Sequence, residues 1–151
     1  ENIPGICGFA AALKMRQQHF VEHQEHMAHL RDTFVGQLTQ ALPMVHENGS
    51  TTERVGNTTN LLFSRIDGQA LVARLDQQGI RCSQSSACTN QRPEPSYVLR
   101  AMGLSEENAY SSVRFAFSAQ NTMLEVEQAV AVVVKIVEQL QQFNRLKKNF
   151  N

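Results

Sequence analysis

Cys88 has the setting in this chain that best suits a nucleophile. It lies in a stretch of small and polar residues, 83–92, with no bulky apolar residue near it in the sequence. Clusters of Ser, Thr, Asn and Gln predict an exposed, mobile loop. A thiol in such a loop can ionise, and the thiolate is the form that reacts. Composition alone leaves two interpretations open, a reactive cysteine or a chance surface cysteine.

Arg114 is the second residue that could bind or react. Residues 113–118 alternate in polarity, with Arg114 on the face opposite Val113 and Phe115 and with the small Ala116 beside it. A guanidinium in such a place can hold a carboxylate by two parallel hydrogen bonds. The residues alone favour a plainer interpretation, a structural ion pair or a charge on a solvated outer face, because half-exposed strands commonly carry charge outward.

A stripe of histidines in the first 30 residues raises the question of a metal site. Spacings of three and four residues would place them on one side of a helix, where they could share a metal ion. No cysteine or suitably spaced carboxylate completes a known metal motif, so we expect a solvated polar flank and no metal. The stripe consists of His19, His23, His26 and His29.

The two remaining cysteines are expected to be structural. Cys82 precedes Cys88 by six residues, which matches no zinc or redox spacing. We expect Cys82 to pack in a strand and Cys7 to pack on the first helix. Three cysteines at irregular spacing do not make a disulfide framework, and this favours a reducing compartment, hence the cytoplasm.

The overall composition limits the classes of function. The chain has 151 residues, 42% hydrophobic and 19% charged, which suits one globular domain with its own core. Lys plus Arg number 14 and Asp plus Glu number 14, so the chain lacks the basic excess that binds nucleic acid or anionic membranes. No apolar run is long enough to span a bilayer, and no signal peptide is visible. The chain opens on Glu1 rather than Met, and we expect further sequence before it.

Apolar residues at helical spacing predict that the first 42 residues form either one long helix or two helices with a kink. Leu42-Pro43 ends this region, because proline disfavours helix in the residue before it. The spaced apolar residues are Ile6, Phe9, Leu13, Phe20, Met27, Leu30, Phe34 and Leu38.

Beyond residue 43 we expect strand, helix, strand, loop, helix, strand and helix in that order. A polar, turn-rich stretch, 44–58, precedes them and is expected to form a loop with one short strand at 51–55. The elements are expected at residues 60–66, 69–78, 80–83, 83–92, 95–103, 113–118 and from 122 onward. Asp67 and Gly79 are expected to cap the helix at 69–78, and Thr122 and Glu125 to form a capping box at the start of the last helix. Such elements predict an α+β fold in which helices pack on one side of a small, mainly antiparallel sheet.

Three motifs in the second half resemble one family, the NifS-like cysteine desulfurases, which are class V enzymes of the aminotransferase fold that use pyridoxal phosphate. The resemblance extends back through residues 57–63 and 66–71 and covers nearly the whole chain. The motifs are Ser85-Ser86-Ala87-Cys88-Thr89, residues 94–104 (EPSYVLRAMGL), and Ser111-Ser112-Val113-Arg114-Phe115.

The resemblance implies a domain arrangement. Residues 43–151 would be the carboxy-terminal small domain of a fold-type I enzyme, and residues 1–42 the helical region that links it to a large domain. The family's cofactor lysine belongs to the large domain, and its motif is absent here. Pyridoxal phosphate would therefore be bound by a large domain outside this chain, and the fragment alone is expected to be inactive.

The resemblance also implies a reaction. Cys88 would take sulfur from L-cysteine as an enzyme persulfide and leave L-alanine, while Arg114 would hold the substrate carboxylate. The partners implied are a sulfur-acceptor protein, such as an iron–sulfur scaffold, and a second copy in a homodimer. The chain departs from the family pattern at Ser85 and Ser118, where glycine is usual, and at Ala119, where arginine is common.

Two alternatives stay open. A selenocysteine lyase or another class V enzyme would share the fold, and the sequence does not separate sulfur from selenium. A sulfur-carrier or interaction module without cofactor chemistry is the non-enzymatic alternative. The residues upstream of Glu1 would discriminate them, because only the enzymes require a large domain with the cofactor lysine.

Overall fold

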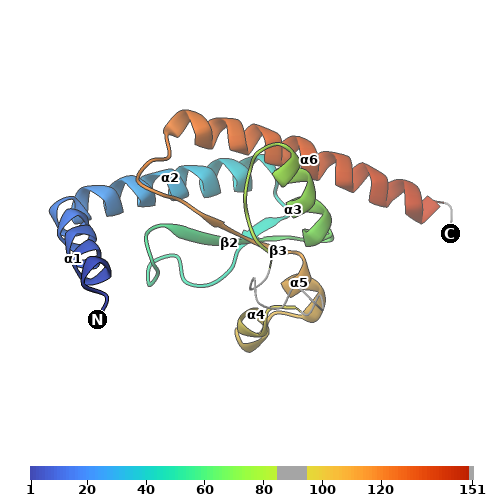
Figure 1. The fold of residues 1–151 in the computed structure, drawn as a ribbon. Coiled ribbons are helices and arrows are strands. Elements are labelled where there is room, and N and C mark those ends of the chain that lie inside the picture. Colours follow the sequence, from blue (N-terminus) through green and yellow to red (C-terminus); the bar gives the residue numbers. More distant parts are fainter. Residues whose placement is uncertain (85–94, 150–151) are drawn as a thin grey trace.

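The computed structural model describes residues 1–84 and 95–149 as a three-stranded sheet with helices around it. The strands are antiparallel in the order β1-β2-β3. Figure 1 shows α2 and α6 above one side of the sheet, with the short α4 and α5 below it. The predicted α+β class is confirmed. The elements are α1 (Ile3–Gln18), α2 (Phe20–Ala41), β1 (Val45–Glu47), β2 (Thr58–Phe63), α3 (Gly68–Gln77), α4 (Tyr97–Ala101), α5 (Glu106–Tyr110), β3 (Ser112–Ala116) and α6 (Met123–Asn149).

The pairing of β2 with β3 divides the sheet into two chemically different faces. Leu61 lies opposite Val113, and Asn60 lies opposite Arg114. Because side chains alternate along a strand, Leu61 and Val113 share the face toward α2 and α6, which we call the core face. Asn60 and Arg114 share the other side, which we call the outer face. The predicted alternation in β3 is confirmed, since Val113 and Phe115 are buried while Arg114 is exposed.

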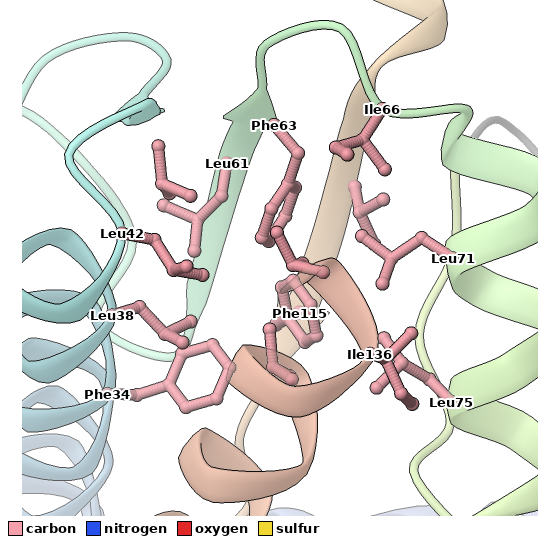
Figure 2. Close-up of a cluster of buried hydrophobic side chains, with 14 of the residues drawn as sticks. Phe34, Leu38, Leu42, Leu61, Phe63, Ile66, Leu71, Leu75, Phe115 and Ile136 are labelled. Carbon is pink, nitrogen blue, oxygen red and sulfur yellow. The ribbon is translucent and has the colours of Figure 1, made fainter. Parts of the chain in front are cut away.

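Apolar side chains from α2, α3 and α6 meet those of the core face in one cluster, part of which Figure 2 shows. The Phe34 ring of α2 lies 4.9 Å from the Phe115 ring, centroid to centroid, and Phe115 in turn lies 6.4 Å from Phe63. Burying each such side chain contributes roughly 1.5–3 kcal/mol. The core face of the sheet is therefore packed against the helices, and the outer face is left for other contacts.

The first 42 residues form two helices that break at His19, whose backbone leaves the helical region (φ −117°, ψ 20°). Of the two forms left open by the sequence, the kinked one is found, and Figure 1 shows α1 turned away from α2. Helix α1 buries none of its residues, so the predicted packing of Cys7 is wrong: this thiol is exposed. The expected division after residue 42 stays a prediction.

Two strand predictions are corrected. Residues 51–54 form bends, and the first strand is instead β1, an edge strand that pairs with the central strand β2. Residues 80–83 make no strand either: only Ser83 pairs, in an isolated bridge with Arg114. Turn-rich composition located the connection near residue 50 correctly, but three residues of β1 are too few to show a period.

The β1–β2 connection is held in place by two arginines, buried Arg31 and half-buried Arg54. Arg31 of α2 donates from Nη1 to the carbonyls of Val55 and Gly56 at 3.0 and 2.9 Å. Arg54 pairs with the carboxylate of Glu47 and donates to the Thr58 carbonyl at 2.7 Å. These bonds hold the irregular segment between β1 and β2 against α2 and the sheet.

The predicted helix caps are confirmed. Asp67 accepts hydrogen bonds from the backbone of residues 69 and 70 at the start of α3, and Gly79 closes that helix at φ +80°. At the start of α6, Thr122 and Glu125 bond each other's backbone N–H reciprocally. The Thr122 backbone bond is the main cause that lowers the pKa of Glu125. In the part of the chain that the structure covers, no helix is both long and apolar enough to cross a bilayer.

A matched pair of glycine substitutions tests this packing. A Cβ at Gly68, the first residue of α3, would lie 2.3 Å from the Tyr110 carbonyl oxygen, whereas a Cβ at Gly36 in α2 meets no atom within 4 Å. We expect Gly68→Ala to lower the free energy of unfolding by about 1–3 kcal/mol through overpacking. Gly36→Ala should raise it by about 0.5–1 kcal/mol, since alanine loses less backbone entropy in a helix. Urea denaturation measures both, and equal effects would contradict this close approach.

Candidate functional site

A row of four polar residues crosses the outer face of the sheet. Asn60 of β2 lies opposite Arg114 of β3. On one side of this pair, Asn48 follows β1 and donates its N–H to the Asn60 carbonyl at 2.9 Å; on the other, Ser83 bridges to Arg114. Directly opposed residues in antiparallel strands project on the same face. We call Asn48, Asn60, Arg114 and Ser83 the polar row.

The hydrogen-bond alternation of the sheet brings Asn60 and Arg114 close together. The Phe63 N–H donates to Ser111, and the Phe117 N–H donates to Asn57, so hydrogen-bonded pairs fall at alternate positions. The Asn60–Arg114 pair falls between them and is a non-hydrogen-bonded pair. In such pairs the Cα atoms are about 4.5 Å apart and the side chains are closest.

The backbone of Arg114 bonds to Ser83 instead. The Arg114 N–H donates to the Ser83 carbonyl at 2.7 Å, and the Ser83 N–H donates to the Arg114 carbonyl at 3.1 Å. One residue further, the Gln84 side chain donates to the Tyr110 carbonyl. These bonds anchor the chain beside Arg114 directly before residues 85–94.

The Arg114 side chain is exposed. Its guanidinium makes no hydrogen bond or ion pair with any side chain that the structure describes, while its backbone is fully bonded. A guanidinium offers five N–H donors and no acceptor. The arrangement therefore presents a cationic donor group to solvent from a fixed backbone, and a carboxylate is the ligand that such a fork matches best.

Cys88 lies outside the described residues, so its predicted role stays a prediction. The structure does describe the position from which its segment departs: Ser83, five residues earlier, is bonded to Arg114. Five extended residues reach at most about 17 Å. Cys88 is thus tethered within that distance of the polar row by the chain itself.

An open groove adjoins this position. It has a volume of about 1260 Å³ and is lined by residues of the β2–α3 turn, α5 and the end of α6, with Gln84 and Tyr110 on its wall. Arg65 on the same wall has a left-handed backbone (φ 64°), and the Asn144 side chain donates to its carbonyl at 3.1 Å. The groove leaves the anchor at Gln84 accessible to a second molecule.

Cys82 is a packed thiol, as predicted, although it lies outside any strand. It contacts the hydrophobic core and is partly buried. Burial, and secondarily the charge of Asp76, raises its pKa to about 11. A thiol with so high a pKa is a poor nucleophile near neutral pH.

Three of the four histidines of the predicted stripe, His19, His23 and His26, make side-chain contacts in the structure. His26 donates from Nε2 to the Asn121 carbonyl at 2.8 Å and so joins α2 to the turn before α6. The rings of His19 and His23 stack with centroids 5.5 Å apart, and His19 lies 3.4 Å from Glu22. Over residues 1–84 and 95–149, no cluster of three or more His, Cys, Asp or Glu side chains could hold a metal ion.

Sequence reasoning missed Asn60 and Asn48 as members of the site. Asn60 occupies an outward position of β2, but its partner in β3, Arg114, lies 54 positions further along the chain. No local pattern encodes such a register. The only usable signal was the alternation in β3, which placed Arg114 outward without indicating its neighbours.

The known proteins that this chain resembles fall in one group, as the family model, the curated relatives and the solved structures agree. The family model described as aminotransferase class V matches residues 1–129. A cysteine desulfurase of Trichormus azollae is 36% identical over 149 residues, and a cysteine desulfurase IscS of Methanosarcina thermophila is 34% identical over 146 residues. Among solved structures, a NifS-like protein has a TM-score of 0.79 at 27% identity over 93% of this chain, and the NifS-like protein of Rickettsia africae has 0.79 at 28% over 91%.

The chain spans just over a third of these relatives. The match with the T. azollae protein covers 99% of this chain but 37% of that protein, and the two structures are covered to 35% each. The predicted small-domain fold is confirmed by these neighbours, which share the arrangement of helices and sheet over nearly all of this chain.

Differential alkylation tests the assignment of the cysteines. With a pKa of about 11, roughly one Cys82 thiol in a thousand is ionised at about pH 8. We expect iodoacetamide to modify exposed Cys7 rapidly and Cys82 only slowly, followed peptide by peptide with mass spectrometry. Cys82 should become reactive when the pH is raised toward its pKa or when urea unfolds the protein. Equal rates for Cys7 and Cys82 at about pH 8 would contradict the burial of Cys82.

Proposed function

Because the chain belongs to the aminotransferase class V family, we propose that the intact protein is a pyridoxal-phosphate-dependent cysteine desulfurase that converts L-cysteine to L-alanine. The observation that carries this proposal concerns Arg114. Its guanidinium on the outer face is unpaired among the described residues, and its backbone is bonded to Ser83, directly before the segment that holds Cys88. Arg114 in β3 thus offers a group that can bind a carboxylate and also anchors the segment that carries the Cys88 thiol.

Arg114 binds the substrate α-carboxylate in this proposal. Its fixed backbone and the absence of a competing carboxylate among its described neighbours leave both prongs of the guanidinium free for a ligand. By contrast, the side chains of Arg31 and Arg54 are committed to backbone carbonyls and neighbouring carboxylates. Arg114 is therefore the better candidate of the three for binding a ligand.

Cys88 is the sulfur acceptor in this proposal. Its thiolate attacks the sulfur of cysteine, an S–S bond forms while the C–S bond breaks, and the released three-carbon product gains a proton as alanine. The persulfide then passes its outer sulfur to an acceptor. The tether at Ser83 keeps Cys88 within reach of the substrate carboxylate site, and the groove beside Gln84 gives an acceptor access to the same region.

Cysteine desulfurases and class V aminotransferases use pyridoxal phosphate, which supplies an electron sink when bound. The lysines whose side chains are described do not fit a holder of this group. Lys14 is exposed on α1, and Lys135 is exposed on α6, on the far side of the sheet from the polar row. In this proposal the residues of this chain hold the substrate, and a large domain outside it holds the cofactor.

The proposed partners follow from the reaction. The persulfide requires a sulfur-acceptor protein, of which an iron–sulfur scaffold is one class, and a homodimer is the proposed assembly of the intact enzyme. Apolar side chains of α1 that are exposed in the described structure, such as Phe9 at 73% exposure, are available for contacts with those partners. We propose the cytoplasm as the location, on the basis of free cysteines at irregular spacing.

Removal of Arg114 tests the carboxylate site. In the intact protein with pyridoxal phosphate, Arg114→Ala should weaken binding of L-cysteine by about 2–4 kcal/mol, roughly 30- to 1000-fold in KM. Arg114→Lys should fall between, because an ammonium keeps the charge and loses the fork. Steady-state alanine production measures both.

Arg81→Ala is the matched control, since it removes the same charge from an exposed arginine two residues before Ser83. It should leave KM unchanged. An unchanged KM in Arg114→Ala, or an equal rise in Arg81→Ala, would remove Arg114 from the site.

Removal of the thiol tests the proposed nucleophile. Cys88→Ala in the intact protein should abolish cysteine-dependent alanine release and the labelled persulfide seen after incubation with ³⁵S-cysteine. Cys7→Ala, which removes an exposed thiol far from the polar row, should retain both. Normal turnover in Cys88→Ala would disprove the proposed sulfur transfer.

A further inference from the structure

We propose that Asn60 is a second ligand of the substrate carboxylate, held beside Arg114 with its amide nitrogen free by a chain of hydrogen bonds through Asn48 and Ser112. The inference rests on the proposed function and names a residue that determines its specificity. It starts from the register, which makes Asn60 the direct cross-strand neighbour of Arg114.

The chain of hydrogen bonds begins in α5, and the donor and the acceptor of each bond are defined. The Ser112 hydroxyl, fully buried, donates to the Asn108 carbonyl at 2.7 Å. Its proton is thereby committed, so the same oxygen accepts the 3.0 Å bond from Nδ2 of Asn48. The other hydrogen on that nitrogen is donated to Oδ1 of Asn60 at 2.7 Å.

The consequence is a defined orientation of the Asn60 amide. Its oxygen is occupied by Asn48, and among the residues that the structure describes its Nδ2 has no hydrogen-bond partner. Reversing the Asn60 amide would set two NH₂ groups against each other and lose the 2.7 Å bond. The network therefore fixes the nitrogen as the free end of Asn60.

Asn60 and Arg114 together offer several donors, and the side-chain oxygen of Asn60 already accepts a bond from Asn48. Asn60 is half-buried while Arg114 is exposed. A small anion bound to both residues would therefore be partly shielded from water on the side of Asn60. A carboxylate matches it, because one oxygen can take a guanidinium N–H and the other an amide N–H. The positive charge of Arg114 disfavours a cation at the same place.

The test uses the intact protein with pyridoxal phosphate. Asn60→Ala should raise KM for L-cysteine about 10- to 100-fold and leave kcat within about twofold, since a hydrogen bond to a charged group held throughout the reaction is lost. Asn60→Asp keeps the oxygen that Asn48 bonds and adds a negative charge beside Arg114, so it should raise KM further. Asn48→Ala, which only frees the Asn60 amide to rotate, should raise KM roughly 2- to 10-fold.

Cysteamine separates a carboxylate ligand from a structural residue, because it has the amine and thiol of cysteine but no carboxylate. Its inhibition constant should be unchanged in Asn60→Ala, whereas a distorted site would weaken both compounds together. Thr58→Val, on the same face of β2 and two residues away, is the matched control and should leave both values unchanged. If KM is unchanged in Asn60→Ala, or rises in parallel with the cysteamine constant, the inference is wrong.

Binding of L-alanine distinguishes this inference from the proposed function. It carries the same carboxylate, needs no sulfur chemistry, and can be titrated through the cofactor absorbance of the intact protein. If the wild type releases no sulfur but binds L-alanine with an affinity that Asn60→Ala weakens, the desulfurase proposal fails and the role of Asn60 stands. If desulfurase activity is normal and Asn60→Ala leaves the affinity for L-alanine unchanged, only the role of Asn60 fails.

Discussion

The antiparallel register between β2 and β3 is the constraint on which the rest of the structure depends. It sends Leu61 and Val113 into the core and Asn60 and Arg114 to the outer face. A slip of one residue would exchange the faces and bury the Arg114 charge against α6, at a cost of several kcal/mol. The apolar cluster under α2, α3 and α6 therefore stabilises the core and also holds the polar row in position.

The same register explains why Arg114 is joined to the chain segment that precedes residues 85–94. A residue in a non-hydrogen-bonded pair with one neighbour directs its N–H and C=O to the other side. For Arg114 that side is the edge of the sheet, where Ser83 takes both groups. The guanidinium and the start of the Cys88 segment are thus coupled through the backbone, which leaves the Arg114 side chain uncommitted.

Comparison of the arginines and cysteines shows how burial separates structural from reactive groups in this chain. Arg31 is 7% exposed and has its donors occupied by Asp32 and backbone carbonyls, whereas Arg114 is exposed and unpaired among its described neighbours. Cys82 packs against the core, and burial raises its pKa, so it does not compete as a nucleophile. Packing thus excludes Arg31 and Cys82 as functional groups and leaves Arg114 as a candidate.

The sequence by itself determined the features that depend on neighbours along the chain. Alternation in β3 placed Arg114 outward, and the Thr122–Glu125 capping box fixed the start of α6; both are confirmed. Short or non-local features could not be predicted: β1 is too brief to show a period, and exposed Cys7 sits on α1, none of whose residues is buried in the described structure. Only the tertiary structure decided that Asn60 lies beside Arg114, because strand register is set by long-range packing and leaves no local pattern in the sequence.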